Sequence, residues 1–150
     1  MKEETAKTPT RGLTVRNAQA ELRRMSDWIA ESARELGQDR EMAVRLKVCA
    51  LEAVSNVIRY AYSDRDTHLI GLRLAVDDGR VTLEIEDDGR AFDPLALPDR
   101  APVPNVERAQ LAGIGIRIIR GLLPESRYEW RDGKNVLILS GAASAPSAGA

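Results

Sequence analysis

The sequence of 150 residues has little of several features that would mark a specialised class of protein. A single cysteine, Cys49, cannot form an internal disulfide, which favours a reducing compartment. The 22 basic residues nearly balance the 23 acidic ones, and no basic block favours nucleic acid as the main partner. No stretch approaches the ~20 apolar residues of a membrane helix. Residues 1–10 also lack the apolar core of a secretory signal. We therefore expect a cytoplasmic protein that binds neither nucleic acid nor membrane.

What is present is the composition of an ordinary globular domain, with 43% hydrophobic and 30% charged residues. A chain of this length forms one domain that buries roughly two-thirds of its unfolded surface. Both ends are small and polar, which is typical of tails. We expect a flexible N-terminal tail over 1–12, one folded domain over 13–140 and a flexible C-terminal tail over 141–150.

Two helices are predicted in the first half of the chain. Apolar residues recur at spacings of three and four before Gly37, which ends the first helix: Leu22, Met25, Ile29, Ala33 and Leu36. Asp39 then caps a second helix, which continues to Tyr60 without glycine or proline. We expect the inward face of this second helix to consist of Val44, Val48, Leu51, Ser55 and Ile58.

After Asp64 the apolar residues alternate, which predicts strands. Two alternating runs joined by Asp78-Gly79 form a β-hairpin, and a second hairpin turns at Asp132-Gly133. A short strand over 13–16 can precede the first helix, and a helix over about 114–123 follows a proline-rich loop. A loop of that length in a compact domain is usually functional. Helices on one face of a mostly antiparallel, mixed sheet make a two-layer α/β sandwich.

Glu52 and Asn56 form the first candidate site, on the second predicted helix. Their spacing of four places both side chains on one face, ~6 Å apart along the helix axis. A carboxylate can accept a proton, and an amide oxygen is a suitable ligand for Mg²⁺, which takes few protein ligands. In isolation, however, the pair fits a solvated polar face of a helix better than it fits a site.

Two glycine-containing segments are the next candidates. Asp87-Asp88-Gly89 ends the first hairpin, where a carboxylate can accept a hydrogen bond from an adenine amino group. Gly113-Ile114-Gly115 opens the third predicted helix, whose free N–H groups suit phosphate. Alone, the first fits an ordinary turn better than it fits a site, and the second is a weak motif. Neither fits a Rossmann or Walker-type site.

The order of these three segments resembles that of the Bergerat-fold, histidine-kinase-like ATPases. Within that superfamily the chain is most similar to the bacterial anti-sigma-factor serine kinases of the RsbW and SpoIIAB type. The likeness runs from about Leu13 to Leu139 and rests on three ordered boxes. They are Leu51-Glu52-Ala53-Val54-Ser55-Asn56-Val57-Ile58-Arg59-Tyr60-Ala61-Tyr62, Asp87-Asp88-Gly89-Arg90-Ala91-Phe92-Asp93-Pro94 and Leu111-Ala112-Gly113-Ile114-Gly115-Ile116.

The resemblance implies ATP and Mg²⁺ as cofactors and assigns a role to each box. Glu52 would be the general base, Asn56 the Mg²⁺ ligand and Asp87 the adenine-binding residue, and residues 93–110 would form the ATP lid. The remaining nucleotide-binding residues implied by the likeness are Tyr60, Gly89, Ala91, Phe92, Gly113, Ile114, Gly115 and Ile116. The family also implies a homodimer that sequesters a sigma factor and phosphorylates a serine of a STAS-domain anti-anti-sigma protein. For partner docking, the exposed Arg23 and Arg24 are candidates beside the alternative of a solvated basic face.

Three departures from the family pattern bear on the site. Tyr60 stands where histidine is common, and Ala112 replaces the first glycine of the glycine-rich box. Lys134 and Asn135 occupy a stretch where a threonine hydroxyl usually supports the adenine-binding aspartate, so this end of the pocket is predicted to be the weakest. These departures favour an alternative function, a nucleotide-binding partner-switching module with little or no kinase activity. The retained Glu52 favours the kinase.

Overall fold

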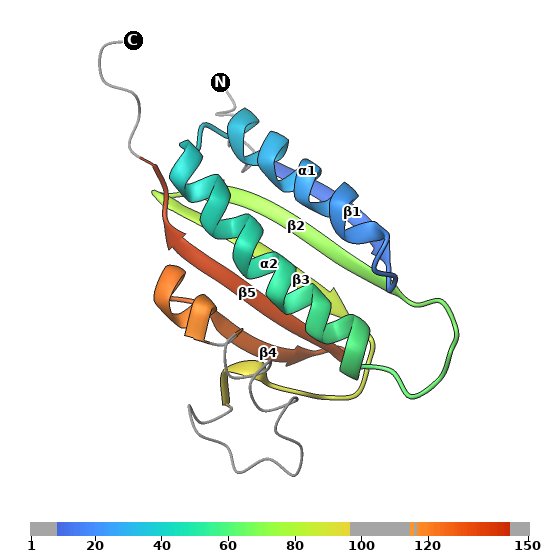
Figure 1. The fold of residues 1–150 in the computed structure, drawn as a ribbon. Coiled ribbons are helices and arrows are strands. Elements are labelled where there is room, and N and C mark those ends of the chain that lie inside the picture. The colour runs from blue at the N-terminus through green and yellow to red at the C-terminus, as the bar shows by residue number, and fades with distance from the viewer. Residues whose placement is uncertain (1–8, 97–114, 116, 145–150) are drawn as a thin grey trace, which may run out of the picture.

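The computed structural model describes residues 9–96, 115 and 117–144. Figure 1 shows a single sheet with two long helices lying across it. Within these ranges no helix is long and apolar enough to cross a membrane. Residues 117–122 form a further short helix that bears no label. The labelled elements are β1 (Thr10–Arg16), α1 (Glu21–Glu35), α2 (Arg40–Tyr60), β2 (Leu69–Asp77), β3 (Arg80–Asp87), η1 (Pro94–Ala96), β4 (Arg127–Arg131) and β5 (Lys134–Ala142).

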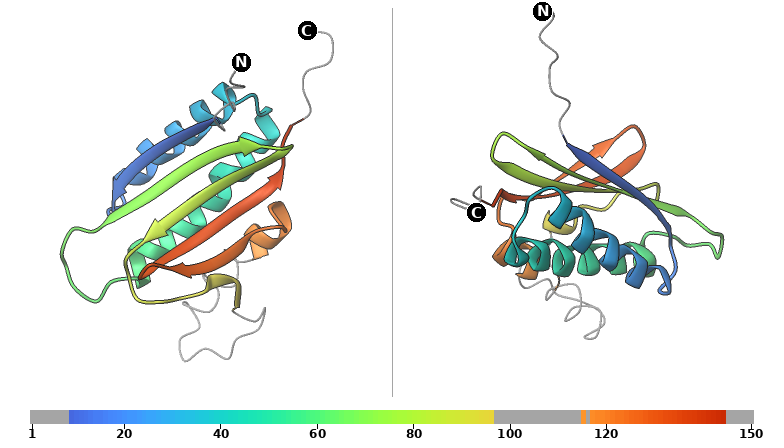
Figure 2. Two further views of the ribbon diagram at one scale, coloured as in Figure 1. Left: turned by 180° about the vertical axis from the view of Figure 1, so that it is seen from behind. Right: turned by 90° about the horizontal axis from the view of Figure 1, so that it is seen from above.

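The five strands are ordered β1-β2-β3-β5-β4, and all four neighbouring pairs are antiparallel. Both long helices cover the same face of the sheet, as the view from above in Figure 2 shows. The predicted two-layer α/β sandwich is therefore confirmed, with antiparallel pairing throughout the described strands. The sheet extends from Thr10 to Ala142, a few residues beyond the predicted domain at each end.

The two predicted hairpins are present because their turn residues adopt the backbone angles that tight turns need. Asp78 and Gly79 have φ values of 50° and 73°, and Asp132 and Gly133 have φ values of 53° and 75°. Positive φ at both central residues defines the type I′ turn, whose twist matches that of the flanking strands. Each turn therefore fixes the register of its hairpin and with it the residues that face the helices.

The core lies between the sheet and the helices. Alternate residues of β3 are buried beneath the helices, with α2 the helix in contact with β3. On α1, Met25, Ile29 and Ala33 of the predicted apolar stripe are fully buried. Gly37, with φ of 80°, follows the last turn of α1, as the sequence predicts. Burial of these side chains is the main source of stability for a domain of this size.

The face of α2 that points to the core differs from the prediction. The buried residues are Leu46, Cys49, Ala50, Ala53 and Val54. Val44 is 44% exposed, and the other four residues of the predicted stripe are only half-buried. The prediction was wrong for Val44 and Val48, which lie outside the core, whereas Leu51 and Ile58 pack against the core from half-buried positions. Small side chains at 49, 50 and 53 instead let the helix lie close to the sheet, and Val44 and Val48 point outward.

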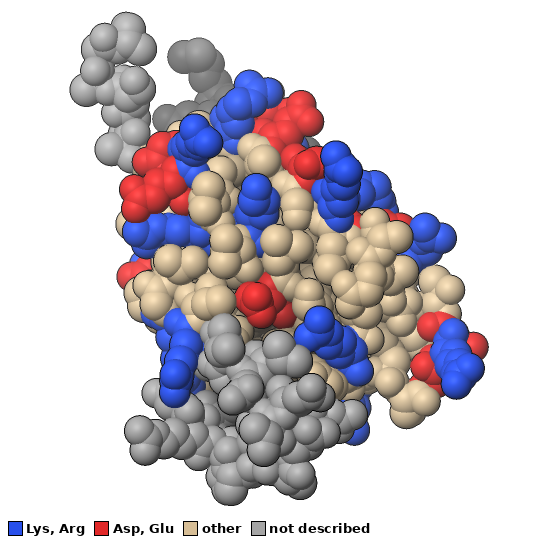
Figure 3. Space-filling view, in the orientation of Figure 1, with Lys and Arg blue, Asp and Glu red and all other residues tan. Residues whose placement is uncertain are grey.

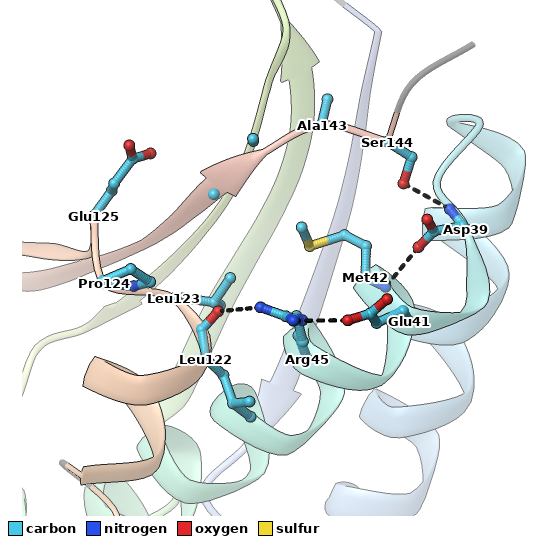
Figure 4. Close-up of a pocket in the computed structure, with 12 residues that line it drawn as sticks. Asp39, Glu41, Met42, Arg45, Leu122, Leu123, Pro124, Glu125, Ala143 and Ser144 are labelled. Carbon is cyan, nitrogen blue, oxygen red and sulfur yellow. Dashed lines mark hydrogen bonds and ion pairs between the residues drawn. The ribbon is translucent and has the colours of Figure 1, made fainter.

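The start of α2 is joined to the end of β5 around a surface hollow of about 440 Å³ (Figure 4). Asp39 caps the helix by accepting from Met42 N at 2.8 Å, and its own N–H donates to Ser144 Oγ at 2.8 Å. Arg45 bonds to Glu41 at 2.7 Å and to the Leu122 carbonyl at 3.1 Å. The polar groups thus bind one another across the hollow, which acts as a structural junction.

The orientation of α2 predicts opposite effects for two substitutions. Ala50→Leu adds three carbons in a fully buried position and should destabilise the fold by about 1–3 kcal/mol. Val44→Ala removes an exposed group and should change stability by less than about 0.5 kcal/mol. Urea denaturation of both variants measures the difference. A tolerated Ala50→Leu together with a costly Val44→Ala would show that α2 faces the other way.

Candidate functional site

Glu52 and Asn56 lie one turn apart on α2, and both side chains are half-buried. Gly115 passes directly against them: a Cβ added there would lie 3.1 Å from Glu52 Oε2 and 3.7 Å from Asn56 Nδ2. The absence of a side chain at 115 therefore leaves the carboxylate and the amide undisturbed. Two of the three predicted boxes thus meet in space. The predicted site residues Gly113, Ile114 and Ile116 lie outside the described residues.

Asp87 is the last residue of β3 and is only 5% exposed. Its Oδ1 accepts hydrogen bonds from Gly89 N at 2.9 Å and from Asn135 Nδ2 at 3.0 Å. Burial raises the pKa of Asp87, and these two hydrogen bonds oppose that rise. No described residue donates to Oδ2. Both of these hydrogen bonds end on Oδ1, so Oδ2 keeps its capacity to accept a further one.

Asn135 on β5 holds Asp87 and the segment that follows it. Besides binding Asp87, its Nδ2 donates to the Arg90 carbonyl at 2.9 Å. Its Oδ1 accepts from Phe92 N at 2.9 Å and from Tyr128 Oη at 2.5 Å. Sequence reasoning treated Asn135 as a weakness at this end of the pocket. The structure shows that the Asn135 amide donates to Asp87, so the support that the resemblance assigns to a threonine hydroxyl is present in another form.

Gly89 closes the end of β3 against the end of α2. A Cβ added at Gly89 would lie 2.6 Å from Ala61 Cβ and 2.7 Å from the Ala61 carbonyl oxygen, closer than real contacts allow. Arg90 N donates to that same carbonyl at 3.2 Å, and Arg90 Nη2 donates to the Tyr60 carbonyl at 3.0 Å. The contact therefore holds Asp87 beside the helix that carries Glu52 and Asn56.

The other predicted site residues lie around this junction. Tyr60 is half-buried, Ala91 is exposed, and Phe92 is 45% exposed although its backbone is held by Asn135. Of the predicted lid over 93–110, the structure describes only residues 93–96, which form η1 after Asp93. Arg120 of the short helix donates to the carbonyl of Leu95. Lys134 forms an ion pair with Glu86 at 2.9 Å, and Ala112 lies outside the described residues.

Sequence reasoning missed a cluster next to Asp87. The rings of Tyr62 and His68 stack with centroids 3.8 Å apart, and Tyr62 Oη donates to Asp88 Oδ1 at 3.1 Å. His68 Nε2 lies 2.7 Å from Asp64 Oδ1, and this hydrogen bond is the main reason that the pKa of His68 is raised. The cluster braces the connection between α2 and β2. No local pattern in the sequence indicates it.

The two arginines predicted for docking differ in their surroundings. Arg24 bonds to Glu21 at 2.8 Å and to the Thr14 carbonyl at 3.0 Å, and Arg16 bonds to Glu21 at 2.9 Å. Arg24, followed by Arg16, lowers the pKa of Glu21. Arg24 thus helps to fix the start of α1 against β1. Arg23 is exposed and forms no ion pair with any described residue, so its role in docking stays a prediction.

These features define a class of protein: a two-layer α/β domain whose central helix carries a carboxylate and an amide beside a glycine backbone. The model of the histidine kinase-like ATPase domain matches residues 15–140. The chain therefore belongs to the histidine kinase-like ATPase domain family, as the sequence predicts. Members of an ATPase family use ATP, so this part of the cofactor prediction stands.

Relatives narrow the family further. The serine/threonine-protein kinase BtrW of Bordetella bronchiseptica is 30% identical over 75% of this chain and 80% of its own length. The serine-protein kinase RsbW of Oceanobacillus iheyensis is 24% identical over 71% of this chain and 70% of its own. An anti-sigma F factor of Clostridium botulinum is 31% identical over 56% of this chain and 62% of its own. These names confirm the predicted kinship with RsbW-type anti-sigma serine kinases.

A solved structure has the same fold. A Mycobacterium tuberculosis chain that holds RsbU and RsbW domains superposes with a TM-score of 0.64 and 19% identity. The match covers 93% of the present chain and 34% of that longer one. The present chain therefore spans about a third of that solved chain, and at this identity the match shows the fold alone.

The close approach at Gly89 predicts a costly substitution. Gly89→Ala places a methyl group against Ala61, so we expect a loss of about 1–3 kcal/mol of stability and weaker nucleotide binding as Asp87 moves. Gly71→Ala is the matched control, because a Cβ at Gly71 meets nothing within 4 Å. Thermal unfolding and nucleotide titration measure both effects. Equal thermal stability and equal nucleotide affinity of the two variants would contradict the role given to Gly89.

The hydrogen bond between His68 and Asp64 predicts a pH-dependent contribution to stability. Because the pKa of His68 is raised in the folded state, the protonated pair stabilises fully below the ordinary value of about 6.5. This contribution is lost as the pH rises through the raised pKa. The destabilisation caused by His68→Gln should therefore shrink between about pH 5.5 and about pH 9. Urea midpoints at both pH values test this, and a constant difference would refute it.

Proposed function

We propose that this chain is a protein serine kinase and anti-sigma factor. It transfers phosphate from ATP to a serine of a STAS-domain anti-anti-sigma protein and sequesters a sigma factor. The observation that carries the proposal is the meeting of Glu52, Asn56 and Gly115 in one place. The names of the relatives, which are serine kinases and anti-sigma factors, support it.

Asp87 and Asn135 provide the adenine end of the proposed site. Asn135 occupies Oδ1 of Asp87, so Oδ2 can accept a hydrogen bond from the adenine amino group. Gly89 keeps the backbone close to α2, and Tyr60, Ala91 and Phe92 border the same junction. The phosphate end then falls at Gly115, where the missing side chain leaves room beside Glu52.

Asn56 fits a site for Mg²⁺. The described residues contain no cluster of three His, Cys, Asp or Glu that could hold a metal ion by itself. Mg²⁺ needs no such cluster, because it commonly takes one or two protein oxygens and completes its shell with phosphate and water. When bound, the ion neutralises charge on the transferred phosphate. Asn56 would hold it through its amide oxygen, next to the carboxylate of Glu52.

Glu52 would act as the general base. Its carboxylate takes the proton of the acceptor serine while the serine oxygen forms a bond to the γ-phosphorus. The bond between that phosphorus and the bridging oxygen breaks, and ADP leaves. Positioning and charge neutralisation supply most of the rate in such reactions. Cys49 has no part in the chemistry, since burial raises the pKa of its thiol to about 12.

The proposal includes a cytoplasmic homodimer. The single buried cysteine and the anti-sigma names of relatives support a place beside the transcription machinery. The deciding experiment is incubation with Mg-ATP and the STAS-domain protein encoded nearby, with phosphoserine read by mass spectrometry. Phosphoserine on that protein is the expected result. A stable complex without phosphoserine would overturn the kinase and favour a partner-switching module that only binds.

Substitutions on α2 separate binding from transfer. Glu52→Ala should keep ATP affinity near that of the wild type and lower the transfer rate by about 10²–10⁴-fold, because only the base is removed. Asn56→Ala should lower both the affinity for ATP and the rate of phosphoryl transfer. Glu31→Gln on the exposed side of α1 is the control, and it should change neither. Transfer by Glu52→Ala at the wild-type rate would show that another group takes the proton.

A further inference from the structure

The outer face of α2 carries apolar side chains that the core does not use. Val44 is 44% exposed, and neither Val44 nor Val48 belongs to the described core or packs against it. Leu51, which also packs against the core, and Ser55 continue this face along the helix, and both are half-buried. Figure 3 shows the result as a strip of uncharged atoms running over the helical side of the molecule between basic side chains. We call Val44, Val48, Leu51 and Ser55 the outer row of α2.

The outer row leads directly to the proposed base. Glu52 follows Val48 by four residues, so the two side chains are neighbours on the helix surface. A general base must come within about 3 Å of the proton that it removes. A protein that brings its serine to Glu52 must therefore lie against α2 at this point. The surface that it meets first is the outer row.

Charge defines the chemistry of the partner. Lys47 and Arg59 flank the outer row, and neither forms an ion pair with any described residue. Arg45, on the same flank as Arg59, is already paired with Glu41 at 2.7 Å. Two cations that form no ion pair with a described residue, placed beside an apolar strip, complement a surface with apolar side chains and an acidic rim. Such pairing mainly steers association and fixes the orientation of the partner.

We propose that the acceptor protein of the phosphoryl transfer docks on the outer row of α2 through an apolar patch with an acidic rim. This inference rests on the proposed function and deepens it, since it gives the acceptor a site on the kinase. Docking there places the acceptor serine beside Glu52. It also accounts for Val44 and Val48, two apolar residues on the solvent side of α2 that lie outside the core.

Charge variants at one position test the docking surface. Val44→Glu and Val44→Lys both remove the apolar contact, but only Val44→Glu places a negative charge against an acidic rim. We expect Val44→Glu to raise the KM for the acceptor and the Kd of the complex about tenfold or more, and Val44→Lys to do so much less. The affinity for ATP should stay unchanged in both. Val48→Glu should behave like Val44→Glu.

The controls separate docking from folding. Leu69 is 60% exposed on β2, away from the outer row, so Leu69→Glu should leave both the KM and the Kd unchanged. Near the start of a helix the macrodipole favours glutamate over lysine. If the variants acted by destabilising the fold, Val44→Lys would therefore lose more than Val44→Glu. If they act on docking, Val44→Glu loses more.

The probe is the STAS-domain protein encoded nearby, with phosphoserine formation and complex formation measured separately. Wild-type affinity and KM in both Val44→Glu and Val48→Glu would overturn the docking site and leave the kinase intact. If wild type binds the acceptor without phosphorylating it, the kinase fails, and weaker binding by Val44→Glu still supports the docking site. If wild type neither binds nor phosphorylates the acceptor, both proposals fall.

Discussion

The contact between Gly89 and Ala61 is the constraint on which the rest of the site depends. It joins the end of β3 to the end of α2 at a distance that excludes any side chain at 89. This contact places the buried carboxylate of Asp87 next to the helix that carries Glu52 and Asn56. A side chain at 89 would force the two layers apart at this corner. The adenine end and the phosphate end of the proposed pocket would then no longer be held in a fixed relative position.

Asn135 makes that corner a stable arrangement. A carboxylate as buried as Asp87 is costly unless donors meet it, and Asn135 and Gly89 provide two. The same amide binds the backbone after Gly89 and accepts from Tyr128 on the edge strand, so three strands and the following segment share one hydrogen-bond network. At position 135, where the chain departs from the family pattern, a donor to Asp87 is therefore still present.

Much of the fold and of the candidate site could be predicted from the sequence, because the turns and the three boxes are local sequence patterns. The turns at Asp78-Gly79 and Asp132-Gly133 have backbone requirements that few residues meet, and the order of the three boxes identified the family. The orientation of α2 could not be predicted, since hydrophobicity favours Val44 and Val48 over the small Cys49, Ala50 and Ala53. The roles of Asn135 and of the Tyr62–His68 stack were also hidden. Their partners are distant in sequence or are joined by irregular chain, where no periodicity applies.

On α2 the proposed base, Glu52, lies between the proposed nucleotide site and the proposed docking surface for a second protein. That arrangement suits a kinase whose substrate is itself a folded protein. The central claim is that Asp87, held by Asn135, recognises adenine. Calorimetric titration of the wild-type protein with Mg-ATP and with Mg-GTP tests it most directly. We predict measurable binding of ATP and much weaker binding of GTP, whose base presents a carbonyl where adenine has its amino group. Equal affinities would contradict this assignment.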